Sequence, residues 1–244
     1  RFRNVTGVQT CALPICYCGR LDPMAQGVTV FLTGDMLTSE NIATWNSCRK
    51  TYRFCAVLGV HTDSYDCLGR ITISADVGAS QVHSYDAALM ALNGTEFWQE
   101  FPPLSAYRYK GRPLWSHARR GTLPQPTPGA MRQIYSIARK EEPRVMRMAD
   151  YRAMVLDDIS QLQSPEEFSA STIREGWQKV GGLVHLLEYE AVVSAGTYIR
   201  GLVADTGRQL GIPAHAWRIT RTALTSTRSE EHTSELQSRF GISY

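Results

Sequence analysis

Segments with strand character and segments with helix character follow one another irregularly along this chain, and this order restricts the possible folds more than any other feature. Apolar and alternating runs predict strands over residues 27–34, 52–60, 71–73 and 183–193. Helical spacing and capping residues predict helices over residues 38–48, 85–93, 164–180 and 199–210. A doubly wound nucleotide-binding fold needs regular alternation of strands and helices. The order therefore predicts an α+β fold with a central mixed or antiparallel sheet flanked by helices.

Some of these segments also carry an expectation about burial or termination. Residues 27–34 are a short apolar, β-branched run and are predicted as a buried strand. Residues 52–60 place alternating apolar side chains on one face, which predicts a half-buried strand, and residues 71–73 are expected to form the return strand of a hairpin. Gly211 follows the last apolar residue of the helix at 199–210, where a C-terminal cap is expected.

The composition places the chain among folded globular proteins. Its 244 residues are 43% hydrophobic and 20% charged, which suits a buried core and excludes a disordered chain. No apolar run approaches the roughly 18 residues that span a bilayer, so we expect no membrane partner. The 6 cysteines lie in the first third of the sequence without C-x-x-C pairs, and this predicts a cytoplasmic protein that lacks a zinc site. We also expect a monomer.

The two ends of the chain resemble translated adapter DNA of the kind ligated to fragments in short-read sequencing libraries. Back-translation of residues 228–238 gives a DNA string whose reverse complement, in a shifted frame, encodes residues 6–15. We therefore expect non-native tails at residues 1–15 and 228–244. One folded domain would then occupy residues 16–227, with its first strand missing. The alternative is two ordinary polar tails.

Positive charge is concentrated in residues 101–140, although the whole chain carries a net charge of only +3. This stretch contains no Asp or Glu, and its basic residues are Arg108, Lys110, Arg112, Arg119, Arg120, Arg132, Arg139 and Lys140. Tyr107, Tyr109 and Trp115 are interleaved with them, so cations and aromatic faces are both available to a nucleic acid. The alternative is a solvated loop with a hairpin at Lys110-Gly111.

Three further segments combine polar residues with glycine or proline in a pattern that suggests chemistry. In residues 19–28, Asp22 lies in a loop between glycines and precedes a proline. Residues 50–53 open the strand predicted at 52–60, and residues 194–202 lead into the helix predicted at 199–210. Taken alone, an aspartate before proline is more often a turn former than a catalyst.

Together, and in this order, the three segments resemble the motifs of the TruB family of RNA pseudouridine synthases. Residues 101–106 and 110–115 are also similar to a segment of that family, and the resemblance extends over essentially all of residues 16–227. It implies the pseudouridine synthase fold and an isomerase that breaks the glycosidic bond of a uridine, turns the uracil and rejoins it through carbon. It implies no cofactor and no metal ion, and the sequence has neither a glycine-rich phosphate loop nor a metal-ligand cluster.

The resemblance implies catalytic roles for Asp22, Tyr52, Tyr198 and Arg200. Asp22 matches the essential carboxylate, which acts as a nucleophile on the ribose or assists glycosidic cleavage and sugar deprotonation. Arg200 matches the arginine that pairs with this carboxylate and offsets its burial. Tyr52 would stack on the uracil and is a candidate for removing a proton from the isomerised base, or else it is a core aromatic. Tyr198 matches a pocket tyrosine.

The expected partner is RNA, in particular tRNA modified at the uridine of its T loop. The residues expected to contact it are Tyr17, Arg20, Lys50, Ile219, Arg221, Arg108, Lys110, Arg112, Arg119 and Arg120. Ile219 matches an apolar residue of the base pocket, and Tyr17 stands where the family commonly has a histidine that helps to open the RNA. Ribosomal or another structured RNA is the alternative substrate, because Arg20 gives a GRLD form also seen in synthases of ribosomal RNA. Outside the enzymes, the alternative is a non-catalytic RNA-binding module. A third alternative is that this chain, without its first strand, folds poorly and is inactive although its parent is active.

Overall fold

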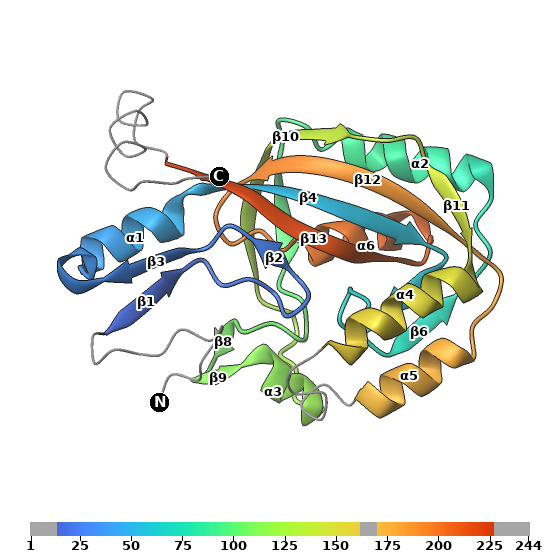
Figure 1. Ribbon diagram of the computed structural model, residues 1–244, viewed down its shortest axis with the longest axis horizontal. Helices are drawn as coiled ribbons and strands as arrows, with labels where there is room; N and C mark the ends of the chain where they lie inside the picture. The colour runs from blue at the N-terminus through green and yellow to red at the C-terminus, as the bar shows by residue number, and fades with distance from the viewer. Residues whose placement is uncertain (1–13, 162–169, 227–244) are drawn as a thin grey trace.

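The computed structural model describes residues 14–161 and 170–226 and shows an α+β fold built on one mixed sheet (Figure 1). The sheet follows the order β2 (Gln26–Gly27), β13 (Ala214–Thr225), β4 (Arg49–Leu58), β12 (Leu183–Val193), β10 (Gly129–Arg139) and β7 (Glu96–Glu100), and β11 (Arg144–Arg147) pairs with β12. The β2–β13 pair is parallel and the other pairs are antiparallel. The predicted fold class is confirmed.

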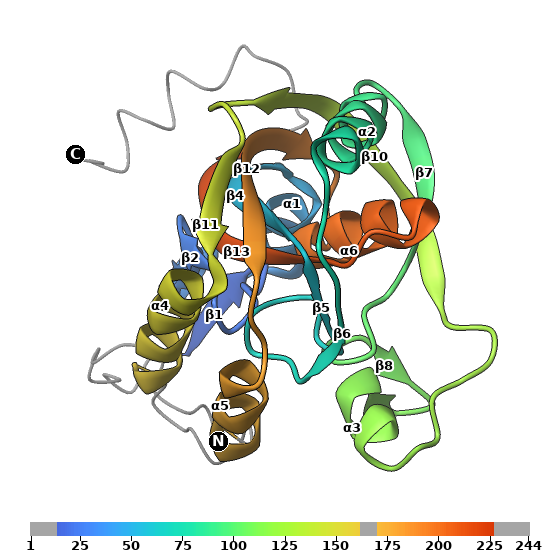
Figure 2. The same cartoon turned by 90° about the vertical axis from the view of Figure 1, so that its right-hand side faces the viewer.

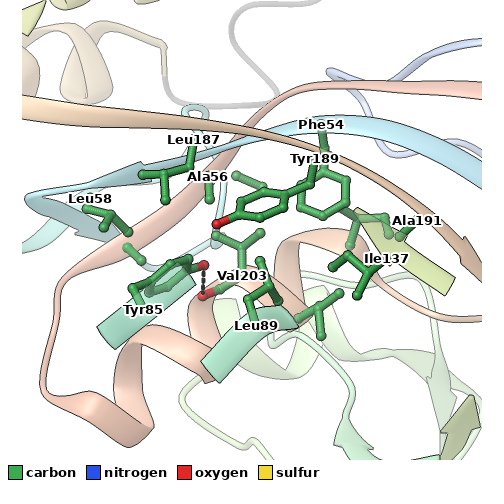
Figure 3. Close-up of a cluster of buried hydrophobic side chains, with 14 of the residues drawn as sticks. Phe54, Ala56, Leu58, Tyr85, Leu89, Ile137, Leu187, Tyr189, Ala191 and Val203 are labelled. Carbon is green, nitrogen blue, oxygen red and sulfur yellow. Dashed lines mark hydrogen bonds between the residues drawn. The ribbon is translucent and has the colours of Figure 1, made fainter. Parts of the chain in front are cut away.

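Helices cover both faces of the sheet, as Figure 2 shows. On one face, α2 (Ala79–Met90) and α6 (Ile199–Leu210) pack against β4, β10 and β12 in an apolar core that includes Phe54, Tyr85 and Val203 (Figure 3). On the other face, α4 (Met148–Ser160) and α5 (Ala170–Gln178) pack against the opposite side of β4, β12 and β13, with Val57 and Trp177 in the core. The strand predicted at 52–60 is therefore present as part of β4, but the prediction that it is half-buried is wrong, because both of its faces are covered.

Smaller ribbons and helices lie outside the central sheet. They are β1 (Ile15–Cys18) paired with β3 (Val30–Thr33), the single turn η1 (Gly34–Met36), α1 (Ser39–Ser47), β5 (Val60–Thr62) paired with β6 (Ile71–Ser74), and β8 (Arg108–Tyr109) paired with β9 (Arg112–Pro113) before α3 (Leu114–Arg119). The buried strand predicted at 27–34 is wrong, since its residues divide between β2 and a largely exposed ribbon strand. Gly27 causes the division: it has φ +109°, and its Cα approaches the Arg221 backbone so closely that a Cβ would collide with it.

The other predicted elements correspond closely to observed ones. The strand at 183–193 and the helix at 199–210 have the predicted bounds, and Gly211 caps that helix with φ 67°. The helix at 38–48 is α1, and the return strand at 71–73 lies in β6, whose partner is β5. The helix at 85–93 begins earlier, at Ala79, after a turn in which the Gln81 side chain caps the Gly78 amide. The predicted helix start at residue 164 lies outside the described residues, as do residues 1–13 and 228–244 of the predicted tails.

None of the helices in the described part of the chain is both long and apolar enough to cross a lipid bilayer.

Candidate active site

Asp22 and Arg200 form a bidentate ion pair. Arg200 Nε donates to Asp22 Oδ2 at 2.9 Å, and Arg200 Nη2 donates to Asp22 Oδ1 at 3.1 Å. Asp22 lies in the loop between β1 and β2, and Arg200 is in the first turn of α6. The Arg200 side chain is only 2% exposed, and it also donates to the backbone oxygens of Ser64 at 2.8 Å and Leu104 at 3.3 Å. The guanidinium therefore joins the Asp22 loop to two other segments and fixes the carboxylate in one orientation.

A second carboxylate, Asp66, lies within the electrostatic reach of Arg200. Asp66 accepts hydrogen bonds from the Ser64 hydroxyl and from the Leu68 amide. Burial raises the pKa of Asp66, although the Arg200 charge and the Ser64 hydrogen bond oppose the rise. Burial also opposes the charge on Arg200, but Asp22 and Asp66 outweigh it and raise the pKa of that guanidinium. Arg200 is therefore a cation held between two acidic side chains.

A cavity of about 270 Å³ opens beside this pair. Its lining brings together residues of the three sequence segments with Asn46 and Ile219. The lining residues are Gly19, Arg20, Leu21, Asp22, Ala25, Asn46, Lys50, Tyr52, Gly196, Thr197, Tyr198, Ile199 and Ile219. Tyr52 and Ile219 are buried on neighbouring strands, β4 and β13, and belong to the apolar core that continues under the cavity. Burial raises the pKa of Tyr52, although Arg221 opposes the rise, so the phenol is protonated near neutral pH. The cavity thus combines an aromatic and apolar wall with one paired carboxylate.

Gln99 holds the backbone of Tyr198 in place. Its side chain is fully buried in β7, where Oε1 accepts from the Tyr198 amide and Nε2 donates to the Tyr198 carbonyl, each at 2.9 Å. Gly201 permits this contact, since a Cβ there would lie 3.2 Å from Gln99 Nε2. Burial raises the pKa of Tyr198 and Asp22 adds to the rise, while Arg200 lowers it. Gln99 therefore fixes the start of α6, the turn that also carries Arg200.

Arg221 supports the Asp22 loop from the interior. It is fully buried on β13, and its guanidinium donates to the Val28 oxygen at 2.7 Å, the Gly19 oxygen at 2.7 Å and the Thr29 hydroxyl at 3.2 Å. The expectation that Arg221 contacts RNA does not fit this burial, because its donors already satisfy a loop of the protein. Arg221 is a positioning residue for the loop that carries Asp22.

Lys50 occupies a similar interior position beside the cavity. Its Nζ donates to the Asn46 oxygen at 3.1 Å and to the Cys48 oxygen at 3.0 Å, and the residue is 5% exposed. Burial and the neighbouring charge of Arg221 lower the pKa of Lys50, while Cys48 and Cys18 oppose the change. Lys50 lines the cavity, so a molecule bound in the cavity can contact this residue. A molecule on the outer surface of the protein cannot contact it.

The basic residues of 101–120 form an exposed arm made of β8, β9 and α3 (Figure 2). The arm's exposed cations are Arg108, Lys110, Arg112, Arg119 and Arg120. The hairpin at Lys110-Gly111 is confirmed, with φ 45° and 79°, and RNA binding by the exposed cations around it stays a prediction. The arm connects to the cavity through ring contacts: the centroid of the tilted Tyr107 ring lies 4.1 Å from that of Phe101, and the Phe101 centroid lies 6.0 Å from that of Tyr198 in an edge-on contact.

Tyr17 and Arg20 lie on the other side of the site. Tyr17 is 41% exposed on β1 and stands opposite Phe31, which is 53% exposed on β3, so the ribbon presents two neighbouring aromatic rings to solvent. Arg20 is exposed and lines the cavity. Among the described residues, no group of three or more His, Cys, Asp or Glu side chains is arranged to hold a metal ion.

Comparison with known families identifies the chain's relatives. The family model described as TruB family pseudouridylate synthase, N-terminal domain, matches residues 7–152. The chain belongs to the TruB family. A tRNA pseudouridine synthase B from Lactobacillus delbrueckii subsp. bulgaricus is 29% identical, with 86% of this chain and 58% of the relative covered. The enzyme of the same name from Aquifex aeolicus is 26% identical, with 88% of this chain and 60% of the relative covered. The chain therefore spans just over half the length of these curated relatives.

A solved structure described as an H/ACA RNP bound to a substrate RNA containing 2′-deoxyuridine is 16% identical, with a TM-score of 0.45. The match covers 94% of this chain and 47% of that chain.

The TruB-family motifs found in the sequence meet at the cavity. Segments 19–28, 50–53 and 194–202 contribute Asp22, Tyr52 and Tyr198 to its lining, and Arg200 pairs with Asp22, although β4 and α6 are far apart in the chain. Two residues of the site were not predicted. Asp66 is not distinguished in sequence from Asp63, which forms a surface pair with Arg70, and Gln99 is one polar residue in a strand that the sequence pattern does not predict. The contacts of both depend on tertiary folding.

Proposed function

We propose that this chain isomerises uridine to pseudouridine in RNA, with Asp22 as the essential carboxylate. The observation that carries the proposal is the bidentate Asp22–Arg200 pair beside a cavity with an aromatic and apolar wall, in a chain of the TruB family. RNA binding alone does not need such a pair, and the burial of the Arg200 guanidinium beside Asp22 costs free energy. A non-catalytic RNA-binding module is therefore the weaker alternative.

The reaction balances without a cofactor. The bond between N1 of uracil and C1′ of the ribose breaks, the base turns, a bond forms between C5 and C1′, and the hydrogen on C5 is lost to solvent while N1 gains one. Asp22 acts either as a nucleophile at C1′ or as the group that assists cleavage and removes a sugar proton. The bidentate contact with Arg200 holds the Asp22 carboxylate in one orientation for both roles.

The other cavity residues would bind and orient the base. Tyr52 would stack on uracil and Ile219 would close the apolar side of the pocket. The raised pKa of Tyr52 makes the phenol a poor base in the resting site, so stacking is its better supported role. Tyr198, held by Gln99, would form the opposite wall.

The substrate we propose is tRNA, modified at the T-loop uridine. The relatives' printed names refer to tRNA, and the exposed cations of the arm at 108–120 can neutralise the phosphates of a folded RNA. A uridine in such a loop must leave its stack to reach Asp22, and the exposed ring of Tyr17 can stack on a neighbouring base. Ribosomal RNA is the alternative substrate. The catalytic domain would be residues 16–227, acting as a monomer in the cytoplasm, with 1–15 and 228–244 as tails.

Nucleoside mapping tests the activity and the substrate together. The chain is incubated separately with an unmodified tRNA transcript and with ribosomal RNA fragments, and pseudouridine is mapped at single-nucleotide resolution. We expect one new pseudouridine in the T loop. Modification only in ribosomal RNA would overturn the tRNA assignment, and RNA binding without any pseudouridine would support the module.

A further inference from the structure

Tyr65 has a backbone conformation that a bulky residue rarely adopts. In the part of the chain that the structure describes, the residues other than glycine with a left-handed φ are Tyr65, Lys110 and Arg218. Lys110 lies at the tip of a hairpin and Arg218 in the irregular part of β13, where such values are common. Tyr65, with φ 67°, lies in a turn between β5 and β6. A left-handed φ costs a residue with a Cβ free energy, so contacts elsewhere must hold this turn.

The residues on either side of Tyr65 both act on Arg200. Before it, the Ser64 carbonyl accepts from Arg200 Nη1 at 2.8 Å. After it, the buried carboxylate of Asp66 lies within the electrostatic reach of the same guanidinium. The conformation of Tyr65 therefore sets the direction of the chain between two groups that hold Arg200.

The backbone of this turn is fastened to the central sheet. The Tyr65 amide donates to the Thr62 carbonyl at 3.2 Å, and the Tyr65 carbonyl accepts from the Ala216 amide of β13 at 2.9 Å. Asp66 also forms an isolated bridge with Ala216. These bonds join the turn to β13, and the link to α6 comes from side chains.

The Tyr65 side chain makes such a link to α6. Its hydroxyl accepts from Arg208 Nη2 at 3.1 Å, and Arg208 Cζ lies 5.6 Å from the centre of its ring. The same Nη2 pairs with Asp205 Oδ1 at 2.8 Å, one turn earlier on α6. The His61 ring of β5 lies 5.4 Å from the Tyr65 ring. Tyr65 is thus held between its own ribbon and the helix that carries Arg200.

Helix α6 meets the turn at two points. Arg200 and Arg208 are eight residues apart on α6, which is about 12 Å along a helix. Arg200 contacts the turn through the Ser64 carbonyl, and Arg208 contacts it through the Tyr65 hydroxyl. Two contacts this far apart prevent the turn from pivoting about either one, so the Ser64 carbonyl stays directed at Arg200.

We propose that Tyr65 is a positioning residue for Arg200 and, through Arg200, for the Asp22 carboxylate. Held by Arg208, the Tyr65 side chain keeps the turn in its left-handed conformation and the Ser64 carbonyl on Arg200. The bidentate contact between Arg200 and Asp22 then keeps one orientation. The effect of Tyr65 on catalysis rests on the proposed function, whereas its effect on Arg200 is a property of the free chain.

Hydrogen exchange of the Arg200 Nε–H tests the positioning role without any substrate. This proton is buried and bonded to Asp22, so it should exchange slowly with solvent, and its NMR signal is the one that disappears in Arg200→Met. Tyr65→Gly removes the ring and frees φ, and Tyr65→Phe removes the hydroxyl alone. The control, Arg70→Gln, removes the ion pair that the exposed Arg70 makes with Asp63 in the same ribbon. We expect exchange about tenfold faster in Tyr65→Gly, about threefold faster in Tyr65→Phe and unchanged in the control.

The same variants test the consequence for pseudouridine formation. We expect kcat to fall about tenfold in Tyr65→Gly and about threefold in Tyr65→Phe. KM should change less than about twofold, because the disturbed group is the reacting carboxylate and not the RNA-binding surface. Tyr65→Phe combined with Arg208→Gln should lower kcat no further than the larger single change, since both remove the same contact. Arg70→Gln should keep the kcat of the parent chain.

The two measurements separate the positioning role from the proposed function. Faster exchange of the Arg200 proton in both Tyr65 variants, with no pseudouridine from the parent chain, would support the positioning role and refute the proposed function. Parent values of exchange and kcat in both variants would refute the positioning role, and so would a higher KM with unchanged kcat, which would mean that Tyr65 contacts RNA. If Tyr65→Gly does not fold, Tyr65→Phe decides, because it keeps the ring and the backbone.

Discussion

Replacement of Arg200 by methionine removes the one cation that faces both Asp22 and Asp66 in the described site. The variant loses two hydrogen bonds to Asp22 and two to backbone oxygens. Breaking a buried ion pair from one side costs 3–5 kcal/mol, and because the Asp22 side chain keeps 24% exposure we expect about 3 kcal/mol of lost unfolding free energy at pH 8.

The loss in Arg200→Met should depend on pH. Asp66 is an acid whose pKa is raised by burial, and without Arg200 the rise is larger. The folded state then binds this proton more tightly than the unfolded chain, so stability is present at low pH and is lost as pH rises through the interval between the two pKa values. The difference from the parent chain should therefore be smaller at pH 5 than at pH 8.

Urea unfolding at pH 5 and pH 8, followed by fluorescence of the buried Trp177 and Trp217, measures both effects. The matched control is Arg208→Met on the same helix, which removes the ion pair that the half-exposed Arg208 makes with Asp205, and less than about 1 kcal/mol is expected. If Arg200→Met costs no more than the control, or costs the same at both pH values, the reasoning about a cation between two buried carboxylates is refuted.

Three further changes test other parts of the account. Gln99→Ala removes both hydrogen bonds to the Tyr198 backbone, so kcat for pseudouridine formation should fall about tenfold while KM changes less than threefold. An unchanged kcat would contradict the role of Gln99 in positioning Tyr198. Burial lowers the pKa of His215 to about 4, so the unfolding free energy of the parent chain should fall by about 3 kcal/mol as pH drops from about 6.5 to 4. Denaturant titrations of His215→Gln should no longer show this fall. If the fall persists in the variant, another group causes it. Lys110→Gln with Arg112→Gln should make the salt dependence of log RNA affinity shallower by about 1 to 2 without lowering saturating kcat; an unchanged slope would place the RNA elsewhere.

The elements that the sequence predicts well are those with uninterrupted periodicity. The strand at 183–193 and the helix at 199–210 have clear apolar patterns, and Gly211 marks the end of the helix. By contrast, β13 was not predicted, because irregularities between Trp217 and Thr220 and between Arg221 and Ala223 shift its register and break the alternation. Local pattern therefore predicted some of the regular elements and missed this bulged one, and the regular helix α4 was not predicted either.

The candidate site shows a similar division. The motifs predict that Asp22 and Arg200 belong together, and the structure pairs them. Composition cannot show that Arg221 is interior, because its charge is compensated by backbone oxygens of a loop nearly two hundred residues earlier in the chain. Gln99 is equally ordinary in sequence, and only the packing of β7 beneath α6 turns its amide toward Tyr198. Side chains that act on distant backbone atoms leave no local signal.

Tritium release tests the central claim most directly. The chain and its Asp22→Asn variant are incubated with tRNA labelled with tritium at C5 of uridine, and RNA affinity is measured in parallel; Asp35→Asn, which changes an exposed aspartate nearby in sequence, is the control. We predict release by the parent chain and the control, none by Asp22→Asn, and RNA affinity within a few fold for all three. Release by Asp22→Asn, or loss of its RNA affinity, would contradict the assignment of Asp22 as the catalytic carboxylate.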